Sequence, residues 1–408
     1  MKVSDVPYSV TAIKGGITAA AGFRAAGVSA GIKASGALDV TLIVADAAVS
    51  AAGLFTTNQV QAAPVKVSKS NLAASGGQAR AIIVNSGCAN ACTGAEGLAT
   101  TEATVAATAA ALGCSPSHVL VSSTGVIGVQ LSREKMLGGV TAAVAALSRD
   151  GGPAARGILT TDLAPKEHAV HVETAGGVFH VGGIAKGAGM IEPMLATMLA
   201  FMTTDAAVAP ALLERALREV TGRTFNAITV DGECSTNDTL AVLASGASGV
   251  TIDESNYPAL VAGLEAVART LALAIVRGGE GATKLVAIHI TGAATDQGAM
   301  RAAKTIANSP LVKTAVHGGD PNWGRLVAAS GRSGARFVLE QATVEVGDVL
   351  LFRNGQPYDE NAPEAAKLLQ DSDIDIHVDL GTGGSGEATA WTCDLSAEYV
   401  RINGEYRT

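Results

Sequence analysis

Short runs of β-branched residues alternate with alanine-rich windows along the first third of this chain. The runs are Asp39–Ala45, Ala81–Asn85 and Val119–Ser122, and the alanine-rich windows are Thr101–Leu112 and Glu134–Leu147. Short apolar β-branched runs favour strands, whereas longer alanine-rich windows favour helices. Their alternation is typical of an α/β protein, in which helices cover a sheet. We therefore predict an α/β fold.

The rest of the chain continues the alternation and is long enough for a second lobe. At 408 residues the chain exceeds a single small core, so two or three domains or one two-lobed body are expected. Aromatic residues make up only 3% of the chain, which predicts close packing of small side chains. Further strands are predicted at Ala169–Glu173, Val178–Ile184, Asn226–Asp231, Leu285–Thr291, Arg336–Leu339, Thr343–Glu345, Ile374–Asp379 and Ala388–Cys393, and further helices at Ala211–Val220, Tyr257–Val276, Thr295–Asn308 and Ala362–Leu369.

Charge and cysteine content exclude several classes of protein. The net charge is −8 and no lysine or arginine cluster appears, so nucleic acid is not an expected partner. We find no convincing apolar window of the roughly 18 residues needed to span a membrane and no signal peptide, which predicts a cytoplasmic protein. The five cysteines are odd in number and irregularly spaced, and Cys88 and Cys92 lack the further ligands of a zinc site. Neither a disulfide framework nor a metal nor a bound cofactor is expected.

The segment Gly182–Asp205, GGIAKGAGMIEPMLATMLAFMTTD, is the strongest candidate for chemistry. It joins a glycine-rich loop with Lys186 to an apolar run that opens at Thr197, and we predict a buried strand over Met198–Met202. A threonine at the start of an element is most often a cap. The alternative is a nucleophile, which needs an adjacent base. If the bond between Ala196 and Thr197 were cut, the new α-amino group could supply that base, since it titrates at about 7.7–8.0.

Several other loops offer polar groups. Ser122–Gly128 follows a predicted strand, and its Thr124-Gly125 pair has a hydroxyl and an accessible amide, the components of an oxyanion hole; a capped glycine turn is the alternative. Glu280 is flanked by glycines in a sequence that does not fit a phosphate-binding loop, and its carboxylate could hold a substrate ammonium. Residues 309–325 are predicted to form a polar loop, with a buried structural turn as the alternative. The aromatic C-terminus suggests a docked tail.

These segments together resemble the ornithine acetyltransferases, the ArgJ family of glutamate N-acetyltransferases. The matching blocks are NQVQAAPV, NSGCANACTG, SSTGVIG, ILTTD, the Gly182–Asp205 segment, DGECSTNDT, GGEGATK, SPLVKTAVHGGDPNWGR and YVRINGEYRT. The resemblance implies a self-processing αββα sandwich of the N-terminal-nucleophile kind with a smaller C-terminal lobe. It implies self-cleavage between Ala196 and Thr197 into an α chain (1–196) and a β chain (197–408), assembled as two α and two β chains.

The resemblance also implies the reaction and the site. Thr197 would take the acetyl group from N-acetylornithine and pass it to glutamate by ping-pong kinetics, and acetyl-CoA could serve as another donor. The implied oxyanion hole is Thr124 and Gly125, and the implied substrate-binding residues are Thr160, Lys186, Thr197, Glu280, Asn403 and Thr408. Which residue of the Thr160-Thr161 pair contacts substrate stays open.

Two positions depart from the family pattern, and two other functions remain alternatives. Glu192 stands where a small residue is common, close before the implied cleavage site, and Cys88 stands where asparagine is frequent. A related self-cleaving aminopeptidase would hydrolyse its acyl-enzyme rather than transfer the acyl group. A non-catalytic small-molecule binder would remain one uncut polypeptide.

Overall fold

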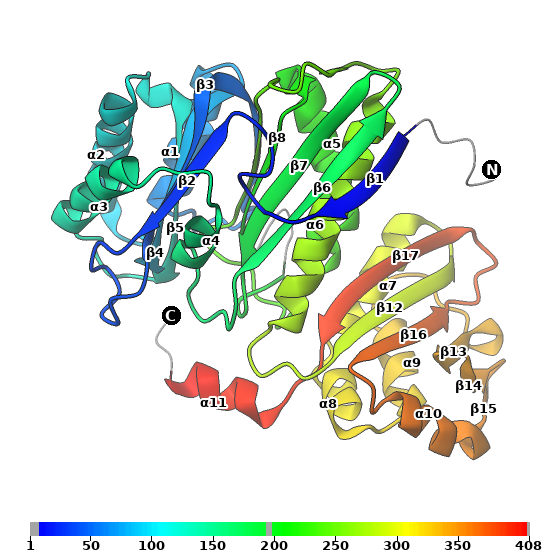
Figure 1. Cartoon of the computed structure of the whole chain (residues 1–408). Helices are drawn as coiled ribbons and strands as arrows, with labels where there is room; N and C mark the ends of the chain where they lie inside the picture. The colour runs from blue at the N-terminus through cyan, green and yellow to red at the C-terminus, as the bar shows by residue number, and fades with distance from the viewer. Residues whose placement is uncertain (1–7, 193–197, 406–408) are drawn as a thin grey trace.

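The computed structural model describes residues 8–192 and 198–405, which form a large sandwich and a smaller C-terminal lobe (Figure 1). The sandwich is built on a nine-stranded sheet of order β1-β6-β7-β8-β10-β3-β4-β5, with β2 also paired to β3. Its strands are β1 (Tyr8–Ile13), β2 (Phe23–Val28), β3 (Val40–Phe55), β4 (Gln78–Cys88), β5 (Val119–Val126), β6 (Lys166–Thr174), β7 (Gly177–Lys186), β8 (Leu199–Thr204) and β10 (Thr239–Ala244). The short strands β9 (Ala207–Val208) and β11 (Thr251–Ile252) pair separately.

The long strand β3 divides this sheet into two facing halves. Its first part, Val40–Ala45, pairs with β2, and its last part, Ser50–Phe55, pairs with β10. The register with β4 shifts in between. One buried cluster contains Ile43 of the first half together with Phe201 and Leu243 of the second. The two halves therefore pack face to face and form the core of a sandwich, in which side chains from the two inner faces meet.

Helices cover the two outer faces. The helices of the sandwich are α1 (Ala63–Ala74), α2 (Gly94–Leu112), α3 (Arg133–Ala145), α4 (Gly152–Gly157), α5 (Pro210–Arg223) and α6 (Tyr257–Arg277). Helices α2 and α3 pack on the half formed by the start of β3 with β4 and β5. Helices α5 and α6 pack on the half formed by β6, β7, β8 and β10. The layers are thus helix, sheet, sheet, helix, and the predicted α/β layered fold is confirmed (Figure 1).

The smaller lobe has its own core around a six-stranded sheet of order β15-β14-β13-β16-β12-β17. Its strands are β12 (Leu285–Ala293), β13 (Thr343–Val346), β14 (Val349–Arg353), β15 (Gln356–Pro357), β16 (Asp373–Asp379) and β17 (Gly386–Cys393), and its helices are α7 (Asp296–Ala307), α8 (Pro310–Gly318), α9 (Trp323–Gly331) and α10 (Ala362–Leu368). The last helix, α11 (Ala397–Glu405), leaves this lobe and runs beneath the sandwich in Figure 1.

Four sequence-based predictions of local structure were wrong. Ser122–Gly128 was predicted as a loop after a strand, but β5 continues to Val126. Residues 309–325 contain two helices rather than a loop, because the side chains of Ser309 and Asn322 accept hydrogen bonds from backbone amides and cap them. The predicted strand Asn226–Asp231 is a 3₁₀ turn followed by a loop, and Arg336–Leu339 is not a strand. The predicted strand at Met198–Met202 is confirmed as β8, although it begins one residue later and continues to Thr204.

Helix α6 corrects the expectation that no apolar window is long enough to span a bilayer. Among the described residues it is the helix that could do so by length and composition. Most of it is buried, however, and residues such as Leu264 and Leu271 belong to the core formed with β6 and β7. We interpret α6 as a core helix, since a buried helix of a large protein is also apolar over most of its surface.

Candidate active site

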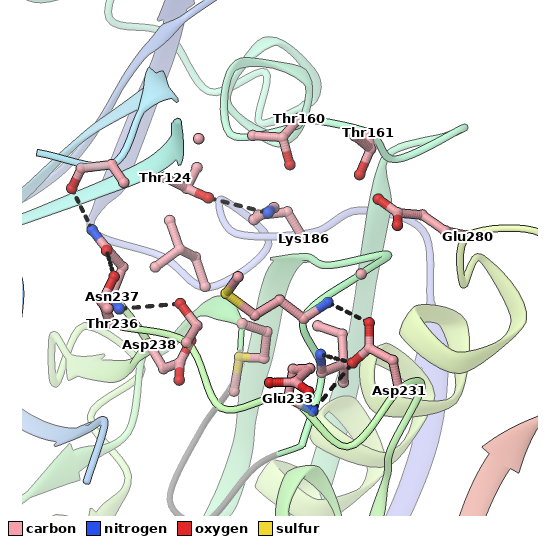
Figure 2. Close-up of a pocket in the computed structure, with 18 of the residues that line it drawn as sticks. Thr124, Thr160, Thr161, Lys186, Asp231, Glu233, Thr236, Asn237, Asp238 and Glu280 are labelled. Carbon is pink, nitrogen blue, oxygen red and sulfur yellow. Dashed lines mark hydrogen bonds between the residues drawn. The ribbon is translucent and has the colours of Figure 1, made fainter. Parts of the chain in front are cut away.

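A polar cavity lies where the ends of several elements of the sandwich meet helix α11 (Figure 2). It encloses about 140 Å³, roughly ten times the 10–15 Å³ that one water molecule needs. Its lining comes from the ends of β5 and β7, the start of β8, the loop before β10, the loop after α6, and α11. The cavity is large enough for a small molecule and brings together residues up to about 300 positions apart in the chain.

Thr124 and Gly125 lie at the end of β5 and line this cavity. Gly125 has a φ of +129°, and a Cβ there would lie 2.4 Å from the carbonyl carbon of Gly87 and 2.6 Å from the amide nitrogen of Cys88. Only glycine fits such a backbone, since other residues avoid this region and the neighbouring strand leaves no space. The pair predicted as an oxyanion hole is therefore held rigidly at a strand end.

Lys186 is the last residue of β7, and its Nζ donates a hydrogen bond of 3.1 Å to Thr124 Oγ1. The side chain is buried, and burial lowers the pKa of its ammonium group from the ordinary value, against the raising effects of Asp162, Asp238 and Glu280. A buried amine that faces several carboxylates and one hydroxyl can bind a substrate carboxylate as a point charge. Figure 2 shows Lys186 and Thr124 pointing toward each other.

Asp162 holds the neighbouring loop in place. Its Oδ1 accepts hydrogen bonds from Lys166 Nζ and from the amide of Gly187, at 2.7 Å for the latter, and its Oδ2 accepts one from the amide of Thr160 at 3.2 Å. Burial raises the pKa of the Asp162 carboxyl, but the charges of Lys186 and Lys166 outweigh it, and the net pKa is lowered. The ionised carboxylate thus fixes the loop whose residues Thr160 and Thr161 both line the cavity.

Glu280 and Asn403 meet at the opposite wall. Asn403 Nδ2, on α11, donates a hydrogen bond of 2.8 Å to Glu280 Oε2. The carboxylate lies against Gly189, where an added Cβ would come within 2.4 Å of Oε2. Gly281 likewise leaves room for α11, because a Cβ on it would lie 2.5 Å from the amide nitrogen of Tyr399. Docking of the C-terminal tail is thus borne out for residues 397–405 by contacts of α11 with the loop after α6.

The segment that follows β7 is pinned by Asp231. The carboxylate accepts hydrogen bonds from the amides of Met190 at 2.7 Å and Ile191 at 2.8 Å, and from the hydroxyl of Tyr399 at 3.1 Å. Met190 has a φ of +58°, unusual for a residue other than glycine. A bidentate carboxylate is suited to hold such a turn, since it satisfies two neighbouring amides at once.

Two predicted residues central to the reaction, Ala196 and Thr197, lie outside the described residues, as does Thr408. Ile191 and Met198, on either side of that gap, both line the cavity and are buried.

Sequence reasoning assigned no role to several side chains that line the cavity, among them Asp231, Asp238 and Tyr399. The polar loop at 232–239 was noted in the sequence, but nothing in its composition distinguishes a buried carboxylate from a solvated one. None of the seven histidines lines the cavity, and the described residues contain no group of three or more His, Cys, Asp or Glu placed to hold a metal ion.

Residues 24–408 match the sequence model of the ArgJ family. The chain belongs to the ArgJ family. It is 47% identical over 397 residues to the arginine biosynthesis bifunctional protein ArgJ of Parasynechococcus marenigrum, a match that covers 97% of this chain and 96% of that protein. It is 46% identical to the ArgJ protein of Symbiobacterium thermophilum over 97% of this chain and 99% of that one. The predicted family and the predicted acyltransferase of arginine biosynthesis are confirmed.

Solved ArgJ-family structures match parts of the chain. A crystal structure of the arginine biosynthesis bifunctional protein ArgJ from Bacillus halodurans matches with 41% identity and a TM-score of 0.48, covering 50% of this chain and 97% of that one. A crystal structure of ornithine acetyltransferase from Mycobacterium tuberculosis, complexed with ornithine, matches with 45% identity and a TM-score of 0.42, covering 46% of this chain and all of that one.

Proposed function

We propose that this ArgJ-family chain transfers an acetyl group from N-acetylornithine to glutamate through an acetyl ester on Thr197. The observation that carries the proposal is the convergence of Thr124, Gly125, Lys186 and Glu280 on one cavity beside Met198, the neighbour of Thr197 in the sequence. A hydroxyl nucleophile, donors for an oxyanion and two opposite charges for substrate are the parts that acyl transfer requires.

The reaction begins with self-cleavage between Ala196 and Thr197, which gives Thr197 a free α-amino group. This amine takes the proton of the Thr197 hydroxyl as the hydroxyl attacks the acetyl carbonyl. The hydroxyl of Thr124 and the amide of Gly125 stabilise the oxyanion, and the amine then returns the proton to the departing nitrogen of ornithine. Glutamate enters the same pocket and reverses these steps, so the kinetics are ping-pong.

The two charged walls of the cavity suit both substrates. Lys186 is a cation for the α-carboxylate that N-acetylornithine and glutamate share, and Glu280 is an anion for the side-chain ammonium of ornithine. Asn403 orients the Glu280 carboxylate through its 2.8 Å hydrogen bond. Thr160 and Thr161 both border the cavity and provide hydroxyls for the remaining polar atoms of the substrate.

The two products of cleavage would stay together. Strand β8 of the C-terminal product pairs with β7 of the N-terminal product from Leu199 to Thr204, and β10 pairs with β3 over six residue pairs. Helix α6 also packs on β6 and β7, and helix α5 packs on β3. An α and a β chain held by one continuous sheet form the unit that we propose assembles into a tetramer of two α and two β chains.

Acetyl-CoA is the second acetyl donor in this proposal, which rests on the bifunctional character named for the curated relatives. The thioester would acetylate Thr197 in the same pocket and yield N-acetylglutamate. Glutamate-dependent release of free CoA from acetyl-CoA measures this activity.

The test of acetyl transfer is the glutamate dependence of ornithine release. Purified protein is given N-acetylornithine with and without glutamate, and free ornithine is measured over time. We expect release to require glutamate and N-acetylglutamate to appear in equal amount. Rapid release without glutamate would mean that water accepts the acetyl group, as in the alternative hydrolase.

A further inference from the structure

The wall of the cavity that carries Glu280 is built from two segments far apart in the sequence. Glu280 lies in the loop after α6, and Asn403, which donates a hydrogen bond to it, lies on α11. A carboxylate that binds a substrate ammonium in one orientation has to stay in one place. The loop and the helix must therefore be held against each other by further contacts.

Asp394 supplies such contacts from outside the cavity. It directly follows β17 and is 2% exposed. Its Oδ1 accepts hydrogen bonds from the amides of Thr283 at 2.7 Å and Lys284 at 3.0 Å, and its Oδ2 accepts one from the Thr283 hydroxyl at 2.6 Å. His317 Nδ1, near the end of α8, lies 2.6 Å from the same Oδ2. Both oxygens are occupied, and three of these contacts fix the segment that follows Glu280.

The contacts of Asp394 suit an ionised carboxyl group. Burial raises its pKa, but hydrogen bonds with Thr283, His317 and Lys284 outweigh this effect, and the net pKa is lowered. A carboxylate accepts at both oxygens, whereas the amide of asparagine has one oxygen that accepts and one nitrogen that only donates. Asp394→Asn would therefore keep the shape of the side chain and place a donor opposite other donors.

The residues after Asp394 contact the same loop. Ser396 Oγ donates a hydrogen bond of 2.6 Å to the carbonyl oxygen of Gly281. A Cβ on Gly281 would lie 2.5 Å from the amide nitrogen of Tyr399, so the backbones of the loop and of α11 touch. On its other side, the loop is bonded by the Glu280 amide to the carbonyl oxygen of Ala188 at 2.9 Å.

Asp394 also lies where the chain leaves the smaller lobe. Helix α11 follows it and runs beneath the sandwich (Figure 1). The amide of the next residue, Leu395, donates a hydrogen bond of 3.3 Å to the carbonyl oxygen of Lys313 on α8. A displacement of Asp394 would thus move α11 relative to the loop, and with it Asn403 relative to Glu280.

We propose that Asp394 is a positioning residue for the acetyl donor, which acts through Glu280 and so rests on the proposed function. Its carboxylate joins the loop after α6 to the start of α11, and Glu280 and Asn403 consequently meet where the side-chain ammonium of N-acetylornithine binds. Asp394 itself does not line the cavity. Glutamate has no side-chain ammonium, so its half-reaction does not depend on this contact.

The experiment measures kcat/KM for both substrates in the full-length protein carrying Asp394→Asn. We expect kcat/KM for N-acetylornithine to fall roughly 10- to 100-fold, since a displacement of about 1 Å can cost about 10²-fold, and kcat/KM for glutamate to change by less than about threefold. Asp379→Asn is the matched control, because Asp379 accepts hydrogen bonds from the amide of Gly381 at 2.7 Å and the hydroxyl of Thr291 at 3.0 Å in the same lobe. It should leave both values unchanged.

Combination with Glu280→Gln separates positioning from a general loss of structure. If Asp394 acts through Glu280, adding Asp394→Asn to Glu280→Gln should lower kcat/KM for N-acetylornithine by less than about twofold further, because coupled residues are not additive. An unchanged kcat/KM for N-acetylornithine in Asp394→Asn, equal losses for both substrates, or a full additional loss in the double variant would overturn the inference.

Thr283 provides a second test if Asp394→Asn does not fold. The residue is exposed, and Thr283→Val removes its hydroxyl bond to Asp394, whereas Thr283→Ser keeps it. We expect Thr283→Val to lower kcat/KM for N-acetylornithine alone, by roughly 3- to 10-fold for one lost hydrogen bond, and Thr283→Ser to match wild type. Unchanged kinetics in Thr283→Val would overturn the inference. A wild-type protein that releases no ornithine from N-acetylornithine would refute the proposed function, and the role of Asp394 with it.

Discussion

Replacing Gly189 with alanine should weaken recognition of the acetyl donor without unfolding the protein. The new Cβ would lie 2.4 Å from Oε2 and 2.6 Å from Cδ of Glu280, whereas carbon atoms in contact prefer roughly 3.5–4.0 Å. The carboxylate must move by about 1 Å to restore that separation, and it would leave its 2.8 Å hydrogen bond with Asn403. Since a flexible side chain rather than backbone has to move, we expect the free energy of unfolding to fall by less than about 1 kcal/mol.

The loss of activity should fall on the half-reaction with N-acetylornithine, because the displaced Glu280 carboxylate can no longer bind its side-chain ammonium. A hydrogen bond between two such charged groups contributes about 1.5–3 kcal/mol, and its loss would lower kcat/KM for N-acetylornithine roughly 10- to 150-fold. In ping-pong kinetics kcat/KM for each substrate reports its own half-reaction, and glutamate has no side-chain ammonium for Glu280 to bind. We therefore expect kcat/KM for glutamate to change by less than about threefold.

The assay is a matrix of initial rates with both substrates varied, together with urea unfolding. Gly222→Ala is the matched control, because Gly222 is exposed on α5 and an added Cβ would meet nothing within 4 Å. It should leave both kcat/KM values unchanged and could stabilise the helix by about 0.5–1 kcal/mol. An unchanged kcat/KM for N-acetylornithine in Gly189→Ala, or equal losses for both substrates, would refute the role given to Glu280.

Three further perturbations test the supports of the site. Tyr399→Phe removes the 3.1 Å hydrogen bond to Asp231, and urea unfolding should show a loss of about 0.5–1.5 kcal/mol. Lys304→Ala removes the cation 3.2 Å from Glu192, and we expect the free energy of unfolding to fall by up to about 3 kcal/mol, because a buried charge is left unpaired. Adding Glu192→Ala should restore part of that stability, as measured by urea unfolding of the double variant. The lowered pKa of Asp162 means that its stabilising effect is complete above its unfolded pKa of about 3.9 and is lost as pH falls through the lower folded pKa. Urea midpoints measured from pH 6 down to pH 2 should therefore decline less steeply in Asp162→Asn than in wild type, and equal slopes would contradict this.

Much of the fold follows from local pattern. Helix α2 ends at Leu112 as predicted, because Gly113 adopts the left-handed conformation that terminates helices, and α6 begins and ends within a residue of its predicted limits. The helices at residues 309–325 were missed because their cap signals, Ser309-Pro310 and Asn322, were interpreted as loop residues. The order β7-β8-β10-β3 could not be predicted, since it depends on pairing between strands far apart in sequence.

The residues of the site were predicted from family resemblance, whereas the contacts between them could not be predicted from the sequence. Thr124, Gly125, Lys186, Glu280 and Asn403 line one cavity, but their association was implied by family resemblance rather than by spacing. The bond between Lys186 and Thr124 joins residues 62 positions apart, and no local pattern encodes it. The burial of Asp238 is likewise set by tertiary packing, so a composition-based view of its loop could not separate it from the exposed Glu233.

The measurement that tests the central claim most directly is a mass spectrum of the purified wild-type protein beside Thr197→Ala. The account predicts two chains for wild type, the second beginning with Thr197, and one uncut, inactive chain for the variant. An intact wild-type chain of 40.7 kDa that transfers acetyl groups, or an active uncut Thr197→Ala protein, would contradict it.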